Sequence, residues 1–176
     1  MIEIACGTGY WTQFIARAAA HIVALDLALE TLLLARNRLP ANKVSLCVGD
    51  AYDLPLGPGC FDAAFAGFWF SHLPKTRRRE FLTGLGERLK PGAKVVLLDN
   101  RFVEGSSSPI TEQDADGNTY QTRILADRSV HRILKNFPLE SEMQAMLDGI
   151  GENGLLTNWQ YFWAFEYRSK GPLAKA

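Results

Sequence analysis

The stretch Glu3-Ile4-Ala5-Cys6-Gly7-Thr8-Gly9-Tyr10-Trp11-Thr12 decides the fold of this chain. A short apolar strand, expected over Met1–Ala5, runs into a turn of small residues, and a helix, expected over Trp11–Ala20, starts at once. Gly7 and Gly9 allow tight backbone conformations and leave no side chain in the way of a ligand. The amides at the start of the helix can hold a negative or polar group. The stretch therefore predicts a ligand-binding loop between a strand and a helix.

The same alternation of strand and helix continues to about residue 100. Further strands are expected over Ile22–Leu27, Val44–Gly49, Phe61–Gly67 and Lys94–Asp99, and helices over Ala28–Leu39 and about Lys75–Leu89. Strand, helix and strand in repetition imply crossover connections and a parallel sheet. The strands are apolar nearly throughout, as expected when helices cover both faces of a sheet. The sequence thus predicts an α/β fold with a doubly wound, mostly parallel sheet.

The pattern changes after residue 99. Asn100–Asn118 is rich in Gly, Ser, Pro and Asp, and we expect an irregular loop over the carboxyl edge of the sheet. Thr119–Leu125 and Val130–Phe137 flank a turn and predict an inserted β-hairpin, and Leu139–Leu147 predicts a short helix. We expect a frayed tail over Lys170–Ala176.

Aromatic residues occupy every second position of a last predicted strand, Trp159–Tyr167. They are Trp159, Tyr161, Trp163, Phe165 and Tyr167. Alternate positions of a strand share a face, so one face is entirely aromatic. Two interpretations follow: an antiparallel edge strand that packs this face on a helix, or an aromatic wall of a substrate site.

Composition excludes several classes of protein. Lys plus Arg equal Asp plus Glu at 19 each, so no global field attracts nucleic acid or an anionic membrane, and a small-molecule partner is favoured. No stretch approaches the roughly 20 apolar residues that span a bilayer, and the N-terminus lacks a signal-peptide pattern. Cys6, Cys47 and Cys60 are odd in number and lack metal-type spacing, which favours a reduced, cytoplasmic setting. Monomer and homodimer both stay open.

The loop after the first strand departs from the dinucleotide-binding fingerprint. That fingerprint requires a small residue where this chain has Thr12, and Ala5 stands where it would begin. Instead, acidic Glu3 inside the strand, followed by alternating small residues, resembles the first motif of class I S-adenosylmethionine-dependent methyltransferases. Ala5 replaces the Gly that usually opens this motif.

Further stretches resemble the same family at suitable spacing. Asp26 at the end of the second strand resembles the acid that binds both ribose hydroxyls, since two acceptor oxygens suit a vicinal diol. Its alternative role is to cap the next helix. Asp50 resembles the acid that takes the adenine amino group, and Ala51 would offer its amide to the ring. Phe61–Leu73 resembles the fourth-strand motif, which lies beside the methionine moiety, and Leu89–Gly92 resembles the family's helix-to-strand turn.

The resemblance covers about residues 1–100 and is nearest to the small-molecule branch that includes quinone and sterol methylases. It implies S-adenosylmethionine as the cofactor and one domain, with a cofactor-binding half over 1–100 and a substrate side over 101–170. The cofactor-binding residues that it implies are Glu3, Ala5, Cys6, Gly7, Gly9, Asp26, Leu27, Asp50, Ala51, Gly67 and Phe68. Members of the family usually carry a helical segment before the first strand. We therefore hypothesise that Met1 is a truncation point or misassigned start, which would leave one wall of the pocket open.

Methyl transfer from a sulfonium depends mostly on positioning, but a weak nucleophile also needs a proton acceptor. His72, just past the fourth strand, is the candidate catalytic residue, and its alternative role is to tie loops together. His131 and Tyr120 of the hairpin would serve as a lid. Arg123 and Lys135 would fix an anionic substrate, although a solvated strand face explains them equally well.

Other features favour blander interpretations. Asp99-Asn100 resembles the magnesium-holding pair of catechol-type O-methyltransferases, but Ser71-His72 stands where those enzymes supply a further Asp, so no metal is expected. Arg77-Arg78-Arg79 indicates a solvated start to a helix.

We expect methyl transfer to a small molecule. The alternatives are a non-catalytic S-adenosylmethionine-binding regulatory or scaffold domain, a nicotinamide-dependent oxidoreductase and an RNA methylase.

Overall fold

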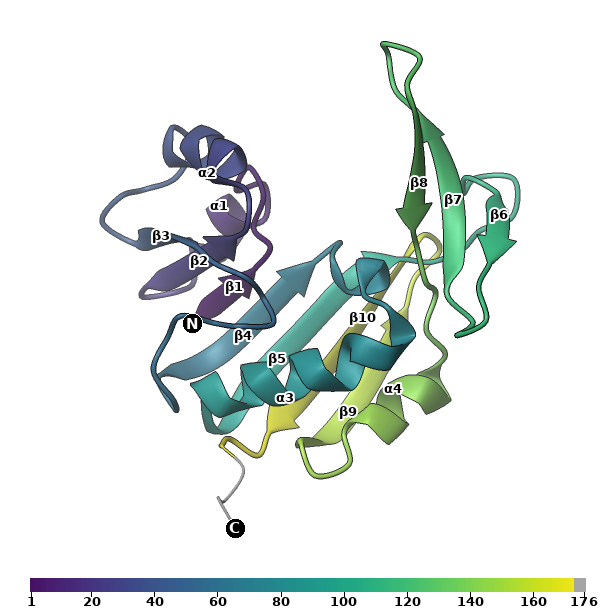
Figure 1. The fold of residues 1–176 in the computed structure, drawn as a ribbon. Coiled ribbons are helices and arrows are strands. Elements are labelled where there is room, and N and C mark those ends of the chain that lie inside the picture. The colour runs from purple at the N-terminus through teal and green to yellow at the C-terminus, as the bar shows by residue number, and fades with distance from the viewer. Residues whose placement is uncertain (173–176) are drawn as a thin grey trace.

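The computed structural model describes residues 1–172, within which seven strands form the main sheet in the order β3-β2-β1-β4-β5-β10-β9 (Figure 1). The strands are β1 (Ile2–Ile4), β2 (Ile22–Asp26), β3 (Val44–Val48), β4 (Phe61–Gly67), β5 (Leu89–Asn100), β9 (Gly151–Asn158) and β10 (Phe162–Ser169). The first five pair in parallel, whereas β10 is antiparallel to both β5 and β9. This confirms the predicted doubly wound α/β fold with an antiparallel C-terminal strand.

The helices lie in the predicted places but are shorter. They are α1 (Thr12–Ile15), α2 (Leu29–Arg36), α3 (Arg78–Arg88) and α4 (Glu140–Met146), with short 3-10 helices η1 (Phe70–His72) and η2 (Lys75–Arg77). The predicted helix over Trp11–Ala20 thus keeps only four residues. Beyond Ile15 the chain tightens, because Arg17 and Ala18 donate to carbonyls three residues back rather than four. None of the helices described is long and apolar enough to cross a membrane.

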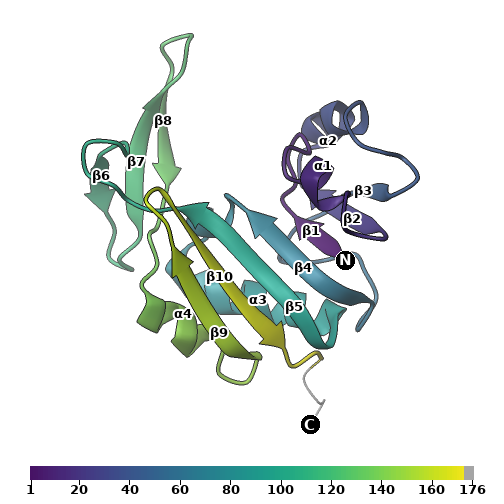
Figure 2. The same ribbon diagram turned by 180° about the vertical axis from the view of Figure 1, so that it is seen from behind.

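Two apolar clusters hold helices to opposite faces of the sheet. Ala16 after α1 and Leu32 of α2 pack with Ile22 and Val44 on one face. On the other face α3 and α4 pack on β1, β4, β5 and β10, with Phe81 and Met143 in the cluster. The prediction that helices cover both faces is wrong for part of the sheet, because no described helix covers the second face of β4, β5, β10 and β9 (Figure 2).

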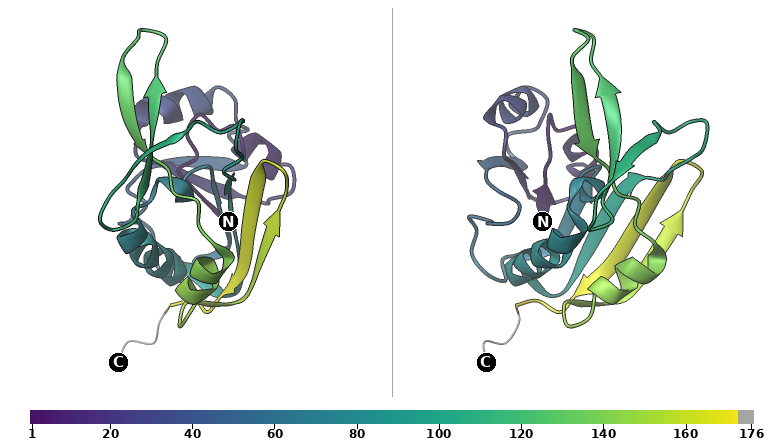
Figure 3. Two further views of the ribbon diagram at one scale, coloured as in Figure 1. Left: turned by 90° about the vertical axis from the view of Figure 1, so that its right-hand side faces the viewer. Right: turned by 45° about the vertical axis from the view of Figure 1, so that its right-hand side comes forward.

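A separate three-stranded antiparallel sheet rises from the carboxyl edge of the main sheet (Figure 3). It consists of β6 (Ile110–Gln113), β7 (Thr119–Ile124) and β8 (Val130–Leu134). The predicted hairpin is confirmed as β7 and β8. The prediction that all of Asn100–Asn118 is irregular is wrong, because Ile110–Gln113 pairs with β7.

The alternating aromatic residues of the last predicted strand form a buried group and an exposed group. Trp163, Phe165 and Tyr167 are buried in the main core, which confirms the packing interpretation for them. Trp159 and Tyr161 precede the strand and are 52% and 43% exposed. The strand is not at the edge of the sheet, because the unpredicted β9 pairs with its outer side.

The predicted frayed tail begins too early. Lys170 donates its amide to the carbonyl of Ile150 at 2.9 Å, and Gly171 is buried. The remainder of the predicted tail, 173–176, lies outside the described residues.

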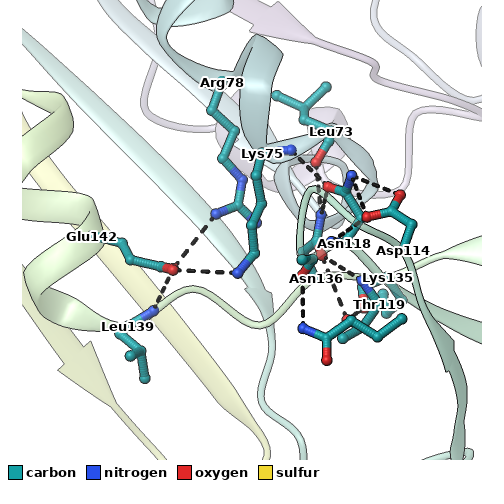
Figure 4. A network of polar contacts seen from close by, with 12 residues as sticks. Leu73, Lys75, Arg78, Asp114, Asn118, Thr119, Lys135, Asn136, Leu139 and Glu142 are labelled. Carbon is teal, nitrogen blue, oxygen red and sulfur yellow. Dashed lines mark hydrogen bonds and ion pairs between the residues drawn. The ribbon is translucent and has the colours of Figure 1, made fainter.

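Two buried asparagines join the base of the hairpin to the segment after β4 (Figure 4). Asn136 Nδ2 donates to the carbonyl of Leu73 at 3.0 Å and to Oδ1 of Asn118 at 3.1 Å. Its Oδ1 accepts from the amide of Thr119 at 2.9 Å, while Asn118 Oδ1 accepts from the amide of Lys75 at 2.8 Å. The orientation of the hairpin over the sheet therefore depends on this network.

We expect Asn136→Ala to lower the free energy of unfolding by about 2–4 kcal/mol, because it leaves the buried carbonyl of Leu73 and the partly buried amide of Thr119 without partners. Urea denaturation measures this change. Asn42→Ala, at an exposed position, is the matched control, with an expected change within about 0.5 kcal/mol. Equal losses for the two variants would contradict the anchoring role of Asn136.

Candidate functional site

The loop after β1 adopts left-handed backbone conformations at alternate residues. The φ angles of Ala5, Gly7 and Gly9 are 51°, 54° and 77°. A Cβ at Gly9 would lie 2.9 Å from Leu39 Cδ1. The lack of a side chain at Gly9 therefore lets Leu39, which follows α2, pack directly against the loop. A Cβ at Gly7 would meet nothing within 4 Å, so Gly7 leaves one side of the loop open. Ala5 adopts a conformation that favours glycine.

Asp26, at the end of β2, is held by both carboxylate oxygens. Its Oδ2 accepts from the amide of Gly7 at 2.7 Å, and its Oδ1 accepts from the amide of Ala28 at 2.9 Å and from Thr31 Oγ1 at 3.2 Å. The carboxylate therefore fixes the loop after β1 and organises the start of α2. Because each oxygen has two lone pairs, Oδ2 keeps capacity for a further donor.

A cleft of about 410 Å³ opens at the carboxyl ends of β1, β2 and β3, and we call it the strand-edge cleft. Predicted cofactor residues contribute Ala5, Asp26, Leu27, Asp50 and Ala51 to its lining. Cys6, Gly7, Gly9, Glu3 and Gly67 lie outside the lining that the described residues form. The fold thus brings together side chains from three loops that are far apart in the sequence.

The opposite wall of the strand-edge cleft was predicted only in part, because Trp69 lies in the stretch Phe61–Leu73 but Tyr52 and Arg77 were not assigned to the site. It consists of Tyr52, Trp69 and Arg77, among others. The Arg77 guanidinium lies 3.6 Å from the centroid of the Tyr52 ring and donates to both oxygens of Glu80 at 2.8 Å. Nothing in the local sequence pattern signals the place of Arg77, because it depends on where η2 packs.

The prediction of a solvated helix start holds for Arg77 but is wrong for Arg78, which is only 2% exposed. Arg78 shares one face of α3 with Phe81, Leu82 and Leu85, which are also buried. That 3.6-residue periodicity is the signal that identifies its burial. The Nη1 atom of Arg78 lies 3.7 Å from Glu142, and burial lowers the pKa of its guanidinium.

Two ionisable groups lie buried around the loop after β1. Burial raises the pKa of Glu3 to about 7, and the neighbouring Thr12 partly opposes this rise. Glu3 Oε2 has no hydrogen-bond partner among residues 1–172. Burial raises the pKa of Cys6 to about 12, with smaller contributions from the charges of Glu3 and Asp26, so its thiol stays protonated and unreactive.

A second cavity, of about 560 Å³, lies between the carboxyl edge of the main sheet and the hairpin, and we call it the hairpin cavity. Its lining includes Phe68, Tyr161, Arg101, Arg123 and Lys135. Phe68 has a φ of 56°, and its amide donates to the carbonyl of Leu98 at 2.7 Å. A strained residue of this kind persists where surrounding contacts hold it.

His72 lines both the strand-edge cleft and the hairpin cavity. Its Nδ1 lies 2.7 Å from the carbonyl of Leu134 in β8, which can only accept, so Nδ1 carries the proton. In the neutral ring Nε2 is then an acceptor. Burial lowers the pKa of His72, and the positive charge of Lys135 lowers it further, which favours the neutral form.

Asp99, at the end of β5, is fully buried and held by several donors. Its Oδ1 accepts from Lys135 Nζ at 2.7 Å, and its Oδ2 accepts from the amide of Ser71 at 3.0 Å. Lys135 also donates to Ser71 Oγ at 2.7 Å. The predicted likeness of Asp99-Asn100 to a magnesium-binding pair therefore corresponds here to an ion pair with a lysine.

The predicted lid residues lie away from both cavities. His131 Nε2 lies 2.9 Å from Ser129 Oγ at the exposed turn of the hairpin. Tyr120 donates to Asp114 Oδ2 at 2.8 Å, and its ring lies 3.3 Å from the guanidinium carbon of Arg132. Neither side chain lines the cavities that the described residues form.

The cleft at the carboxyl edge of this sheet agrees with a family model described as "Methyltransferase domain", which matches residues 1–92. The chain belongs to this methyltransferase domain family. It is similar to demethylmenaquinone methyltransferase of Lactiplantibacillus plantarum, with 33% identity over 106 residues, or 56% of this chain and 44% of that protein. It is also 26% identical over 194 residues to malonyl-(acyl-carrier protein) O-methyltransferase of Pectobacterium atrosepticum, which covers 100% of this chain and 70% of that protein.

A solved structure described as "DhpI-SAM-HEP complex" resembles this methyltransferase domain over 95% of the chain and 77% of its own length. The TM-score is 0.76 and the sequence identity is 25%. The likeness therefore extends past residues 1–92 to the hairpin and the antiparallel strands.

In this methyltransferase domain, we expect Ala5→Gly to raise the free energy of unfolding by about 0.5–1 kcal/mol. Relief of the left-handed conformation gains about 1–2 kcal/mol, and the greater freedom of glycine in the unfolded chain offsets part of it. Ala145→Gly in α4 is the matched control, with an expected loss of about 1 kcal/mol. Thermal and urea denaturation compare the variants, and a destabilised Ala5→Gly protein would refute the strain argument.

Proposed function

We propose that the chain catalyses methyl transfer from S-adenosylmethionine to a small-molecule acceptor. The observation that carries this proposal is the place of His72, whose side chain borders the strand-edge cleft on one side and the hairpin cavity on the other. One cleft suits a cofactor, the second suits an acceptor, and they meet at a group that can accept a proton. Membership of the methyltransferase domain family and the likeness to a solved complex with SAM support it.

The residues around the first cleft fit this cofactor. Asp26 and Asp50 would hold the ribose hydroxyls and the adenine amino group, and Ala51 would offer its amide. Gly7 leaves one side of the loop open. The buried Oε2 of Glu3 has no partner among residues 1–172, and an unpaired carboxylate favours a cationic ligand group nearby. When bound, S-adenosylmethionine supplies a methyl group activated by a sulfonium.

The chain's own groups would then act by orientation and proton acceptance. Phe68 and Tyr161 would hold the acceptor in the hairpin cavity, where they form part of the wall. His72 would take the acceptor's proton at Nε2, while the carbonyl of Leu134 holds Nδ1–H and fixes the ring. We accordingly propose residues 1–100 as the cofactor half and 101–170 as the substrate side of one domain.

Two further points belong to the proposal. A purely regulatory or scaffold role would not require the second cavity beside His72, so catalysis is preferred. Cys6, Cys47 and Cys60 are unpaired, and on this basis we propose a reducing compartment such as the cytoplasm.

Titration calorimetry with S-adenosylmethionine tests the assignment of the first cleft. Glu3 must ionise to pair with a cation, so we expect the affinity to rise as the pH passes through about 7. Glu3→Gln should remove this rise and weaken binding about tenfold at about pH 8. Glu30→Gln, an exposed acid of α2, should leave affinity and its pH dependence unchanged.

The same substitution gives an independent readout of stability. Because folding raises the pKa of Glu3, the protonated side chain favours the folded state at low pH. This contribution to the free energy of unfolding is lost as the pH rises through about 7. Glu3→Gln should therefore stabilise the ligand-free protein by about 1–3 kcal/mol at about pH 8. Greater stability without loss of affinity would show that Glu3 is only structural, and absence of binding to the wild type would refute the proposed function.

Nuclear magnetic resonance of the imidazole nitrogens tests the role of His72. We expect the Nδ1–H tautomer and a pKa below the ordinary value of about 6.5, which the urea-unfolded protein supplies as the reference. His72→Ala should lower kcat by about 10²–10³ with an acceptor whose proton must be removed, and the variant should still bind S-adenosylmethionine. An Nε2–H tautomer, or unchanged kcat, would exclude His72 as the proton acceptor.

A further inference from the structure

The hairpin cavity carries positive charge that its own lining does not balance. Arg101, Arg123 and Lys135 line it, and no acidic side chain does so among the residues that the structure describes. Lys135 is neutralised by Asp99, whose Oδ1 lies 2.7 Å from its Nζ at the floor of the cavity. The excess charge therefore comes from the two arginines.

The arginines on the two faces of the hairpin have different surroundings. On one face Arg132 donates to both oxygens of Glu112 at 2.8 Å and 2.7 Å. On the other face Gln121 and Arg123 line the cavity together with Ile133, which pairs with Gln121 in the strand register. Within residues 1–172, the side chain of Arg123 makes no hydrogen bond or ion pair, whereas its backbone pairs with His131 of β8. Arg123 is exposed, so its guanidinium is accessible to a ligand that enters the cavity.

Arg123 also faces the space that His72 borders. Both residues line the hairpin cavity, and the positive charge of Arg123 adds to the lowering of the pKa of His72 that burial and Lys135 cause. Arg101 follows β5 and also lines the cavity, and its Nη1 donates to the carbonyl of Trp159 at 2.7 Å. The cations therefore converge on the cavity from β7 and from the end of β5.

The remainder of the lining is apolar or neutral. Phe68, Phe137, Tyr161 and Ile133 provide an apolar wall, and Ser106, Ser107 and Ser108 provide hydroxyl groups. A volume of about 560 Å³ accommodates a small organic molecule. A ligand that matches both features has an apolar or aromatic body and an anionic group.

We propose that Arg123, assisted by Arg101, binds the anionic oxygens of the acceptor, so that the substrate class is small organic acids bearing a carboxylate or a phosphonate. The inference rests on the proposed function for the identification of this ligand as the methyl acceptor. A guanidinium suits either anion, because its parallel N–H groups match two oxygens at once. Arg123 is then the residue that determines specificity for charged over neutral acceptors.

The test titrates the full chain with benzoate, phenylphosphonate and neutral benzamide, monitored by nuclear magnetic resonance of the arginine Nε–H groups. Benzoate and benzamide share shape and differ in charge, while benzoate and phenylphosphonate distinguish the two anion types. We expect at least one anion to shift the Arg123 signal and to bind about tenfold or more tightly than benzamide, with an affinity that falls as salt is added. Arg123→Gln should weaken that anion about tenfold and leave benzamide unchanged.

Arg36→Gln, an exposed arginine of α2, is the matched control and should retain anion binding. Equal affinity for benzoate, phenylphosphonate and benzamide, or anion binding that survives Arg123→Gln, overturns the inference. Calorimetry with S-adenosylmethionine is run on the same samples. Cofactor binding without anion selectivity defeats only this inference, whereas Arg123-dependent anion binding without cofactor binding defeats the proposed function.

Discussion

The buried ion pair between Lys135 and Asp99 joins the hairpin to the main sheet. Asp99 lies near the end of β5 of the main sheet and Lys135 follows β8 of the hairpin, and their charged atoms are 2.7 Å apart with little exposure to solvent. A buried pair of this kind adds little net stability, because desolvation opposes the attraction, but loss of one partner leaves an uncompensated charge. The contact therefore acts chiefly as a constraint on geometry. It places β8 where the carbonyl of Leu134 can hold His72.

The sequence predicts the order of the strands along residues 1–100 well, because the relevant signals are local. Strands Ile22–Asp26 and Phe61–Gly67 are largely apolar runs between polar turns. The candidate acids Asp26 and Asp50 lie at or just after the ends of β2 and β3. The strand Gly151–Asn158 escaped prediction because glycines and polar residues fill it, and its pairing with β10 rather than its own propensity makes it a strand. Arg78 was misjudged because three consecutive arginines suggest a solvated surface, although the apolar periodicity of its helix shows otherwise.

The candidate site shows the same division. Asp26, Asp50 and Ala51 could be assigned to one cleft from the sequence, because parallel strands end at one edge of a sheet. Tyr161 could not be assigned to the hairpin cavity, because the aromatic alternation gives it the same expected role as the buried Trp163. The two residues differ because Tyr161 precedes β10, which begins at residue 162, whereas Trp163 lies within the strand. Long-range contacts of this kind leave no local pattern.

Charge is balanced over the whole chain and unbalanced inside one cavity. The formal net charge is zero, yet Asp99 compensates Lys135 while Arg101 and Arg123 face the hairpin cavity without an acidic neighbour in its lining. The same arrangement that would attract an anion also disfavours a proton on His72, because burial and the neighbouring cations both lower its pKa. The proposed anion recognition and the neutral form of His72 are thus both favoured by the positive charge of this cavity. Burial and Lys135 contribute most to the lowered pKa of His72, and Arg123 adds to them.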